Sequence, residues 1–154
     1  MILWVRHGQS TWNAIDRLQG HELGPPLTDL GRAQAAAVAE ELSRRGVAHV
    51  LASPAVRAQQ TAQVVADRLG LEVVTEPLLL EKGLEESVPS VVDRVHRLLA
   101  LELPADTVAV SHGDTIGLAV GLLAGRSPGA PANASILSVD PATRAIEQWL
   151  PSIG

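Results

Sequence analysis

The chain of 154 residues contains no cysteine, no phenylalanine and no tyrosine, and only three tryptophans. Without cysteine, the protein has no disulfide bond, no thiolate metal site and no cysteine nucleophile. The scarcity of aromatic side chains leaves the packing of a core to leucine, valine and alanine. It also disfavours the stacking surfaces on which single-stranded nucleic acids bind.

The sequence also lacks an excess of basic residues. Its 12 Lys and Arg residues against 17 Asp and Glu residues give a formal net charge of −5 at pH 7. Proteins that bind nucleic acids or membrane surfaces usually carry a basic excess, so we expect neither kind of partner. No apolar run approaches the roughly 18 residues of a membrane span, and no basic and apolar leader precedes the first strand. We therefore expect a cytoplasmic protein that holds any anionic ligand with a local group of arginines.

Apolar stretches and helical patterns alternate along the chain. With 46% hydrophobic residues, the sequence suits one globular domain over 1–154. Strands are predicted at 1–5, 47–53, 71–76, 107–111, 135–139 and 145–150. Helices are predicted at 28–45, 55–69, 89–103 and 113–125. This order predicts a three-layer α/β/α sandwich around a mostly parallel sheet of about six strands, with one antiparallel strand in a C-terminal hairpin.

Polar residues follow three of these strands at the point where each ends. Arg6 and His7 follow the first strand, Arg57 lies just beyond the second, and His112 follows the fourth. A lone histidine at a strand end is more often structural than catalytic, and a lone arginine in a first helical turn is more often solvated. However, the carboxyl ends of parallel strands share one edge of a sheet, so these four side chains are predicted to meet there. Such a group suits a tetrahedral anion such as phosphate.

Several ordered motifs resemble the histidine phosphatase superfamily, which includes the phosphoglycerate mutases. They are RHGQSTWN at 6–13, RLQG at 17–20, PLTDLGRAQA at 26–35, SPAVRAQQTA at 53–62 and VSHG at 110–113. An isolated Arg-His-Gly motif is weak evidence, but blocks in the family's order across about three quarters of the chain are strong evidence.

The resemblance implies a mechanism. His7 is expected to attack phosphorus and form a phosphohistidine, with His7, Glu81 and His112 as the catalytic residues. The expected binding residues are Arg6, Arg57, His112 and Asn13 for the phosphoryl group, and Gln19 and Gly20 for the substrate. The resemblance implies no metal and no cofactor.

The proton donor for the leaving alcohol is the least regular part of the pattern. Glu81 matches the acid position of the family, and a carboxyl group in a water-poor pocket can stay protonated near neutral pH. The family pattern usually continues with a glycine four residues on and a Glu-Gly pair, whereas this chain has Gly83, Glu85 and Glu86. Glu85 is therefore a reserve candidate, and a solvated acidic cluster is the structural alternative.

The chain also departs from the family in length. Only 30 residues separate Glu81 from His112, about half the spacing in the larger mutases and phosphatases, and little sequence follows the hairpin to form a lid. Because a mutase must protect its phosphorylated intermediate from water, we expect hydrolysis of a phosphate monoester of a small metabolite. A protein phosphohistidine phosphatase is the main alternative. A phosphoglycerate mutase or a non-catalytic phosphate-binding module is less favoured.

Overall fold

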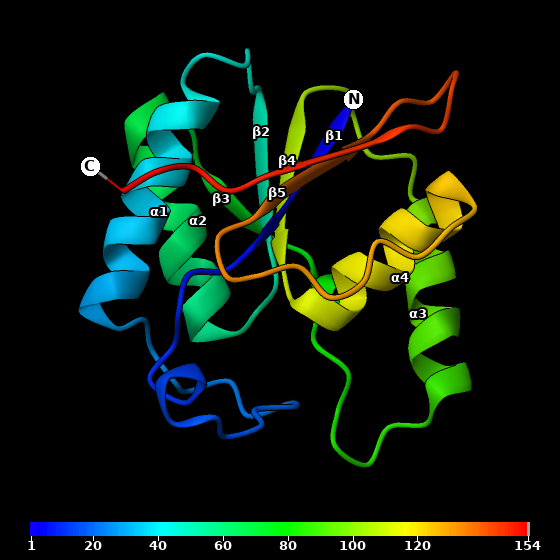
Figure 1. Cartoon of the computed structure of the whole chain (residues 1–154), viewed down its shortest axis with the longest axis horizontal. Helices are drawn as coiled ribbons and strands as arrows, with labels where there is room; N and C mark the ends of the chain where they lie inside the picture. The colour runs from blue at the N-terminus through cyan, green and yellow to red at the C-terminus, as the bar shows by residue number, and fades with distance from the viewer. Residues whose placement is uncertain (154) are drawn as a thin grey trace.

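The computed structural model describes residues 1–153. Its strands are β1 (Ile2–Arg6), β2 (His49–Ala52), β3 (Val73–Thr75), β4 (Thr107–Ser111), β5 (Ile136–Val139) and β6 (Ile146–Trp149). Its helices are α1 (Asp29–Leu42), α2 (Val56–Leu69), α3 (Val88–Ala100) and α4 (Gly113–Ala124), with short 3₁₀ helices η1 (Asn13–Ile15) and η2 (Pro77–Leu79). The α-helices and strands follow one another in the predicted order (Figure 1).

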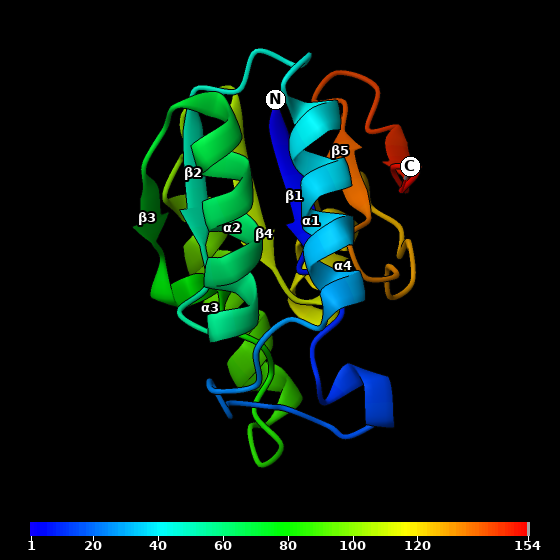
Figure 2. The same cartoon turned by 90° about the vertical axis from the view of Figure 1, so that its left-hand side faces the viewer.

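The six strands form one sheet in the order β3-β2-β4-β1-β5-β6. The first four in this order are parallel, whereas β5 is antiparallel to both β1 and β6. Helices α1 and α2 cover one face of the sheet, and α3 and α4 cover the other (Figures 1 and 2). The predicted three-layer architecture and its single antiparallel strand are confirmed. Within residues 1–153, no helix has the length and apolar character needed to cross a membrane.

Each face of the sheet carries its own apolar core. Alternate residues of β1 point to opposite faces, so Val5 packs with α1 and α2, and Trp4 packs with α3 and α4. The core under α1 and α2 is built largely from alanine and valine, as the shortage of aromatic residues predicted.

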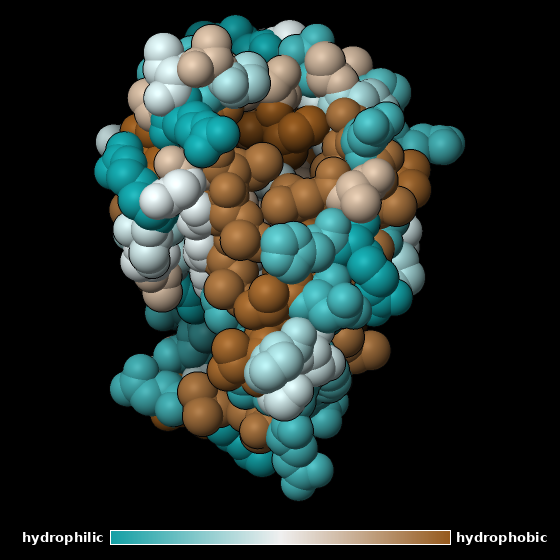
Figure 3. Space-filling view, turned by 90° about the vertical axis from the view of Figure 1, so that its right-hand side faces the viewer, coloured by the Kyte–Doolittle hydropathy of each residue, from teal (hydrophilic) through white to brown (hydrophobic). Residues whose placement is uncertain are grey.

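Helix α4 differs from the prediction in its burial. The small-residue pattern over 113–125 predicted a buried helix, but Leu122 and Leu123 are exposed. The reason is that α4 belongs to an outer layer and turns only one side, including Ile116 and Val120, toward the sheet. Apolar surface is visible on this side of the molecule (Figure 3).

Local signals placed most helix ends correctly. The Thr28 side chain accepts a hydrogen bond of 3.0 Å from the Gly31 N–H, so Thr28 caps α1 as predicted. Helix α2 ends at Gly70, which adopts the left-handed conformation with φ +70°. Helix α1 ends at Leu42, short of the predicted residue 45, because residues 43–46 form turns. Strands β2 and β3 are also shorter than predicted, because β2 pairs with β4 only over His49–Ala52 and β3 pairs with β2 only over Val73–Thr75.

Two glycines hold the loop after β1 against the start of α1. A Cβ atom on Gly8 would collide with the Gly31 carbonyl, and one on Gly31 would collide with the Gln9 carbonyl. The Thr28 N–H also donates a 3.0 Å hydrogen bond to the Gln9 carbonyl. Because these are backbone contacts, they leave no flexible group to move aside. They hold in place the loop that follows His7.

We therefore expect Gly31→Ala to lower the free energy of unfolding by about 1–3 kcal/mol, because it overpacks this contact. Urea denaturation measures the change. Gly24→Ala is the matched control, since a Cβ there would meet only an ordinary contact at 3.5 Å. We expect it to change stability by less than about 0.5 kcal/mol. Equal losses in the two variants would contradict the role given to the Gly8–Gly31 contact.

Candidate active site

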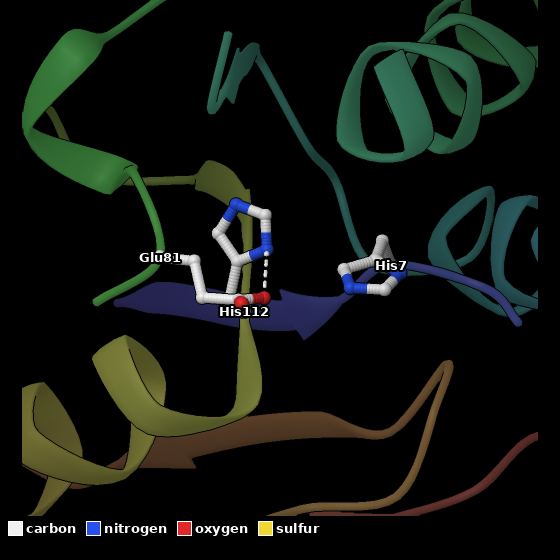
Figure 4. A group of neighbouring side chains, drawn as sticks. All are labelled: His7, Glu81 and His112. Atoms are coloured by element: carbon white, nitrogen blue, oxygen red, sulfur yellow. Dashed lines mark ion pairs between the residues drawn. The ribbon is translucent and has the colours of Figure 1, made fainter. Parts of the chain in front are cut away.

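Three side chains from separate segments gather at the carboxyl edge of the parallel strands (Figure 4). His7 follows β1, His112 follows β4, and Glu81 lies between η2 and α3. The centroids of the two histidine rings are 5.2 Å apart in an edge-on arrangement. One nitrogen or oxygen atom from each of the three residues lies within 4.8 Å of the others. The structure thus brings together the three residues predicted to be catalytic.

His7 is buried and held as a neutral imidazole. Its Nδ1 lies 2.6 Å from the Gly8 carbonyl oxygen, and since a carbonyl only accepts, Nδ1 carries the proton and donates. Burial lowers the pKa of His7 well below its ordinary value, and His112 and the nearby arginines lower it further. The neutral ring therefore keeps a lone pair on Nε2. That lone pair is what a nucleophilic histidine needs.

His112 is also buried and links two parts of the site. Its Nε2 lies 2.8 Å from the Ser53 hydroxyl at the end of β2, and its Nδ1 lies 3.3 Å from Glu81 Oε1. Burial lowers the pKa of His112 well below its ordinary value, and the charges of Arg57 and Arg6 act in the same direction. Burial and nearby positive charge thus both favour the neutral form of the two histidines.

Two arginines supply that positive charge. Arg57 is fully buried and donates to the Glu22 carbonyl at 2.9 Å and to Glu81 Oε1 at 3.2 Å. Arg6 donates to the Pro131 carbonyl at 2.6 Å. The buried Nε–H of each guanidinium has no hydrogen-bond partner among residues 1–153. Burial lowers the pKa of both arginines. Unpaired cationic donors of this kind suit an anion with several oxygen atoms.

Asn13 and Gln19 line a cavity of about 200 Å³ together with Arg6 and Glu81. Asn13 Oδ1 accepts from the Ser10 N–H at 3.0 Å, and Gln19 Oε1 accepts from the Ser10 hydroxyl at 2.5 Å. Because the oxygen atoms of both amides are used in this way, their NH₂ groups are left to donate to a ligand. The cavity therefore contains four of the predicted site residues.

Other predicted residues lie further from the centre. Gly20 is buried, has φ +52°, and a Cβ there would meet Leu84 at 2.8 Å, so its position requires glycine for backbone reasons. Glu85 lines an adjoining cavity of about 720 Å³ rather than the cavity of Glu81.

Two further residues at the site had weak sequence signals. Asp114 lines the same cavity as Glu81, and burial together with the Glu81 carboxylate raises its pKa. Its only signal was its place directly after the His-Gly pair. Asn133 donates to the His7 carbonyl and to Asn13 Oδ1, both at 3.2 Å. Its contact depends on β5 pairing with β1, which local sequence does not specify.

The spacing of His7, Glu81 and His112 also suits a metal ion. However, Glu81 Oε1 lies 3.2 Å from the Arg57 guanidinium, and the charges of Arg6 and Arg57 both act on His7 and His112. A cation at this point would be repelled by the positive charges of Arg6 and Arg57, whereas an anion would be attracted. The electrostatics of the site favour an anionic ligand.

Comparison with known proteins agrees with this geometry. Residues 2–86 match the family model described as histidine phosphatase superfamily (branch 1). A Yersinia pestis (strain Pestoides F) protein named "Probable phosphoglycerate mutase GpmB" is 35% identical over 161 residues, covering 80% of this chain and 74% of that protein.

Solved structures of similar fold include two phosphatases. A mycobacterial glucosyl-3-phosphoglycerate phosphatase in complex with VO3 is 26% identical, with a TM-score of 0.75 over 97% of this chain and 96% of that one. The protein histidine phosphatase SixA in complex with tungstate is 25% identical, with a TM-score of 0.70 over 97% and 96%. With its Arg-His-Gly motif at the end of β1 and its second histidine after β4, this chain belongs to the histidine phosphatase superfamily.

Proposed function

We propose that this protein hydrolyses phosphate monoesters of small metabolites through a phosphohistidine on His7. One observation carries the proposal: a neutral histidine with a free Nε2 lies near two arginines, Arg6 and Arg57, whose buried Nε–H groups are each unpaired among residues 1–153. The histidine supplies a nucleophile and the arginines supply an oxyanion site. The two phosphatase structures, which were solved with oxyanions that resemble phosphate, support this use of the site.

In the first step, His7 Nε2 attacks phosphorus and the bond from phosphorus to the ester oxygen breaks. Arg6 and Arg57 neutralise the phosphoryl oxygen atoms as charge moves onto them. In the free protein the Glu81 carboxylate pairs with Arg57, so the substrate, bound as a phosphate monoanion, first passes its proton to Glu81. Glu81, which lies within 4.8 Å of His7 and His112, then gives that proton to the leaving oxygen. The products of this step are the free alcohol and phosphohistidine.

In the second step, water attacks the phosphohistidine. Glu81, now a carboxylate, takes a proton from that water as its oxygen bonds to phosphorus. The bond from phosphorus to Nε2 breaks, and inorganic phosphate leaves. His7 returns to the neutral tautomer, because Nδ1 keeps its proton in the hydrogen bond to the Gly8 carbonyl.

The shortness of the segment between Glu81 and His112 favours hydrolysis over a mutase reaction. Between Glu81 and His112, the chain forms only a short loop, α3 and β4 with its connection. A mutase must hold its phosphorylated enzyme away from water while the substrate turns, which requires a covering element. Because the chain is similar to a protein named as a phosphoglycerate mutase, mutase activity should be assayed alongside hydrolysis.

A protein phosphohistidine phosphatase is the second candidate, supported by the similarity to SixA. Hydrolysis of phosphohistidine needs less help from an acid, because its nitrogen leaving group is easier to expel than an alkoxide. The presence of Glu81 beside His112 favours the ester, since an alkoxide needs the proton that a carboxyl group donates. For either substrate, we propose that the reaction needs no metal, because the two arginines supply the positive charge.

The position of Glu81 depends on Arg94 of α3, which is nearly fully buried. Its guanidinium donates to the carbonyls of residues 78, 80 and 81 and to the Glu86 carboxylate at 3.0 Å. Arg94 and hydrogen bonds from the Gly83 N–H and the Ser90 hydroxyl lower the pKa of Glu86 to about 2, although burial opposes the shift. An irregular buried segment needs such donors for its carbonyl groups. Arg94 is therefore a positioning residue for Glu81.

The first test removes the nucleophile. We expect His7→Ala to lower kcat on a generic aryl phosphate by at least about 10³-fold, because no other group forms the covalent intermediate. His96→Ala, at an exposed position of α3, is the control and should retain wild-type activity. Rapid-quench labelling with a ³²P-labelled ester should trap phosphohistidine in the wild type only. Equal rates in the two variants, or loss of wild-type activity in a metal chelator, would contradict the proposal.

The second test separates the two candidate substrates. We expect Glu81→Gln to lower kcat on an alkyl phosphate by about 100-fold and on a phosphohistidine peptide by less than about 3-fold, because only the alkoxide needs the acid. Glu85→Gln, which alters a carboxylate in the adjoining cavity, is the matched control. A wild-type enzyme that acts on the phosphohistidine peptide alone refutes the ester as substrate. No effect on either substrate refutes Glu81 as the acid.

The third test concerns Arg94. We expect Arg94→Ala to lower kcat on an alkyl phosphate by about 10-fold, with a much smaller effect on an aryl phosphate whose good leaving group needs little acid catalysis. Arg97→Ala removes an exposed arginine of the same helix, which pairs with Asp93. That variant should resemble the wild type. If Arg94→Ala lowers both rates equally, Arg94 supports the fold in general rather than Glu81.

A further inference from the structure

Arg17 is an exposed arginine at the mouth of the site, and the proposed mechanism does not use it. Its guanidinium carbon lies 3.9 Å from the centroid of the Trp12 ring. Its backbone N–H donates a 2.8 Å hydrogen bond to the Trp12 carbonyl, so the turn between the two residues holds the stack. Within residues 1–153, no carboxylate lies within 4.0 Å of this guanidinium. Arg17 thus presents an unpaired fork of N–H donors on a fixed aromatic support.

A second arginine–tryptophan stack shows what is distinctive about Arg17. Arg45 lies over the Trp149 ring at 4.7 Å, beyond the end of α1. The Arg45 guanidinium also forms an ion pair of 2.8 Å with Glu41, four residues earlier in the chain. The charge of Arg45 is therefore already paired with a carboxylate of the protein. The Arg17 stack, in contrast, leaves its charge available to a ligand.

Arg17 lies where two cavities meet. It lines the small cavity of Arg6 and Glu81, about 200 Å³ in volume, and the adjoining cavity of about 720 Å³. The larger cavity is also lined by Glu85 and Glu86, and the small cavity by Glu81 and Asp114. At the junction of the two cavities, the Arg17 guanidinium is therefore the group that attracts a second anion among these carboxylates, beside the cavity of Arg6.

We propose that Arg17, supported by Trp12, binds a second anionic group of the substrate, a carboxylate or a second phosphate, carried by the leaving group. This inference rests on the proposed function. The transferred phosphoryl group already has Arg6, Arg57 and the free amide donors of Asn13 and Gln19, so it does not need Arg17. In a chain with a net charge of −5, an unpaired cation beside an anion site selects substrates with further negative charge.

Matched esters test this subsite. Ethyl phosphate and phosphoglycolate have leaving groups of similar size but differ by one carboxylate, and propyl phosphate and propane-1,3-diyl bisphosphate differ by a second phosphate. We expect the wild type to favour the anionic member of at least one pair by about 10-fold in kcat/KM, mainly through KM. The pair that shows the preference tells which anion the subsite takes.

Arg17→Ala should reduce the preference for the anionic ester to less than about 2-fold, and Trp12→Leu should reduce it partly. Arg45→Ala, which breaks the other stack, is the control and should keep the wild-type preference. An equal loss of kcat/KM on both members of a pair would place Arg17 in the phosphoryl site and overturn the inference. So would a wild type that hydrolyses both members equally well.

Equilibrium binding tests the Arg17 subsite independently of the proposed hydrolysis, because it requires no turnover. Isothermal titration of His7→Ala with phosphoglycolate and ethyl phosphate measures discrimination without turnover. Tighter binding of phosphoglycolate that is lost in the Arg17→Ala, His7→Ala double variant supports the subsite even if no ester is hydrolysed. Equal binding of the two esters overturns the inference, whatever the outcome of the activity tests.

Discussion

The burial of Arg57 is the constraint on which the rest of the site depends. A guanidinium removed from water costs several kcal/mol unless the protein or a ligand replaces its hydration. The Glu22 carbonyl and the Glu81 carboxylate partner two of its nitrogen atoms, but its Nε–H has no partner among the described residues. In the proposed function, a bound oxyanion accepts from this remaining N–H group. The same charge, together with burial, lowers the pKa of both His7 and His112. One buried cation would thus serve both of the roles that we propose, anion binding and a neutral nucleophile.

Holding such a group in place requires rigid surroundings, and two irregular segments provide them. The loop after His7 is held by the backbone contact between Gly8 and Gly31, where no side chain fits. The segment before Glu81 has only the short 3₁₀ helix η2, and the carbonyl groups of residues 78–80 accept from Arg94, Ser111 and Thr115. Each segment is thus held by contacts or hydrogen bonds with residues of a neighbouring helix or strand. The site is therefore coupled to the packing of α1 on one side and of α3 and α4 on the other.

Much of the fold was predictable from local patterns. The order of the strands and helices, the Thr28 cap and the Gly70 stop all depend on residues that are neighbours in sequence, and all were confirmed. The exposure of α4 was not predicted, because small residues look alike in a buried helix and in an outer layer. The site shows the same division. The positions of Arg6, His7, Arg57 and His112 at one sheet edge followed from parallel pairing, whereas the contacts of Arg94, Asp114 and Asn133 did not.

The sequence by itself determined the family, the layered architecture and the identity of the two histidines and two arginines, because motif order and strand-end position are properties of the linear chain. Only the tertiary structure decided which His7 nitrogen is free, which guanidinium donors remain unpaired, and that Glu81 rather than Glu85 lies beside His112. The physical reason is that protonation and hydrogen-bond satisfaction depend on burial and on partners far apart in the chain.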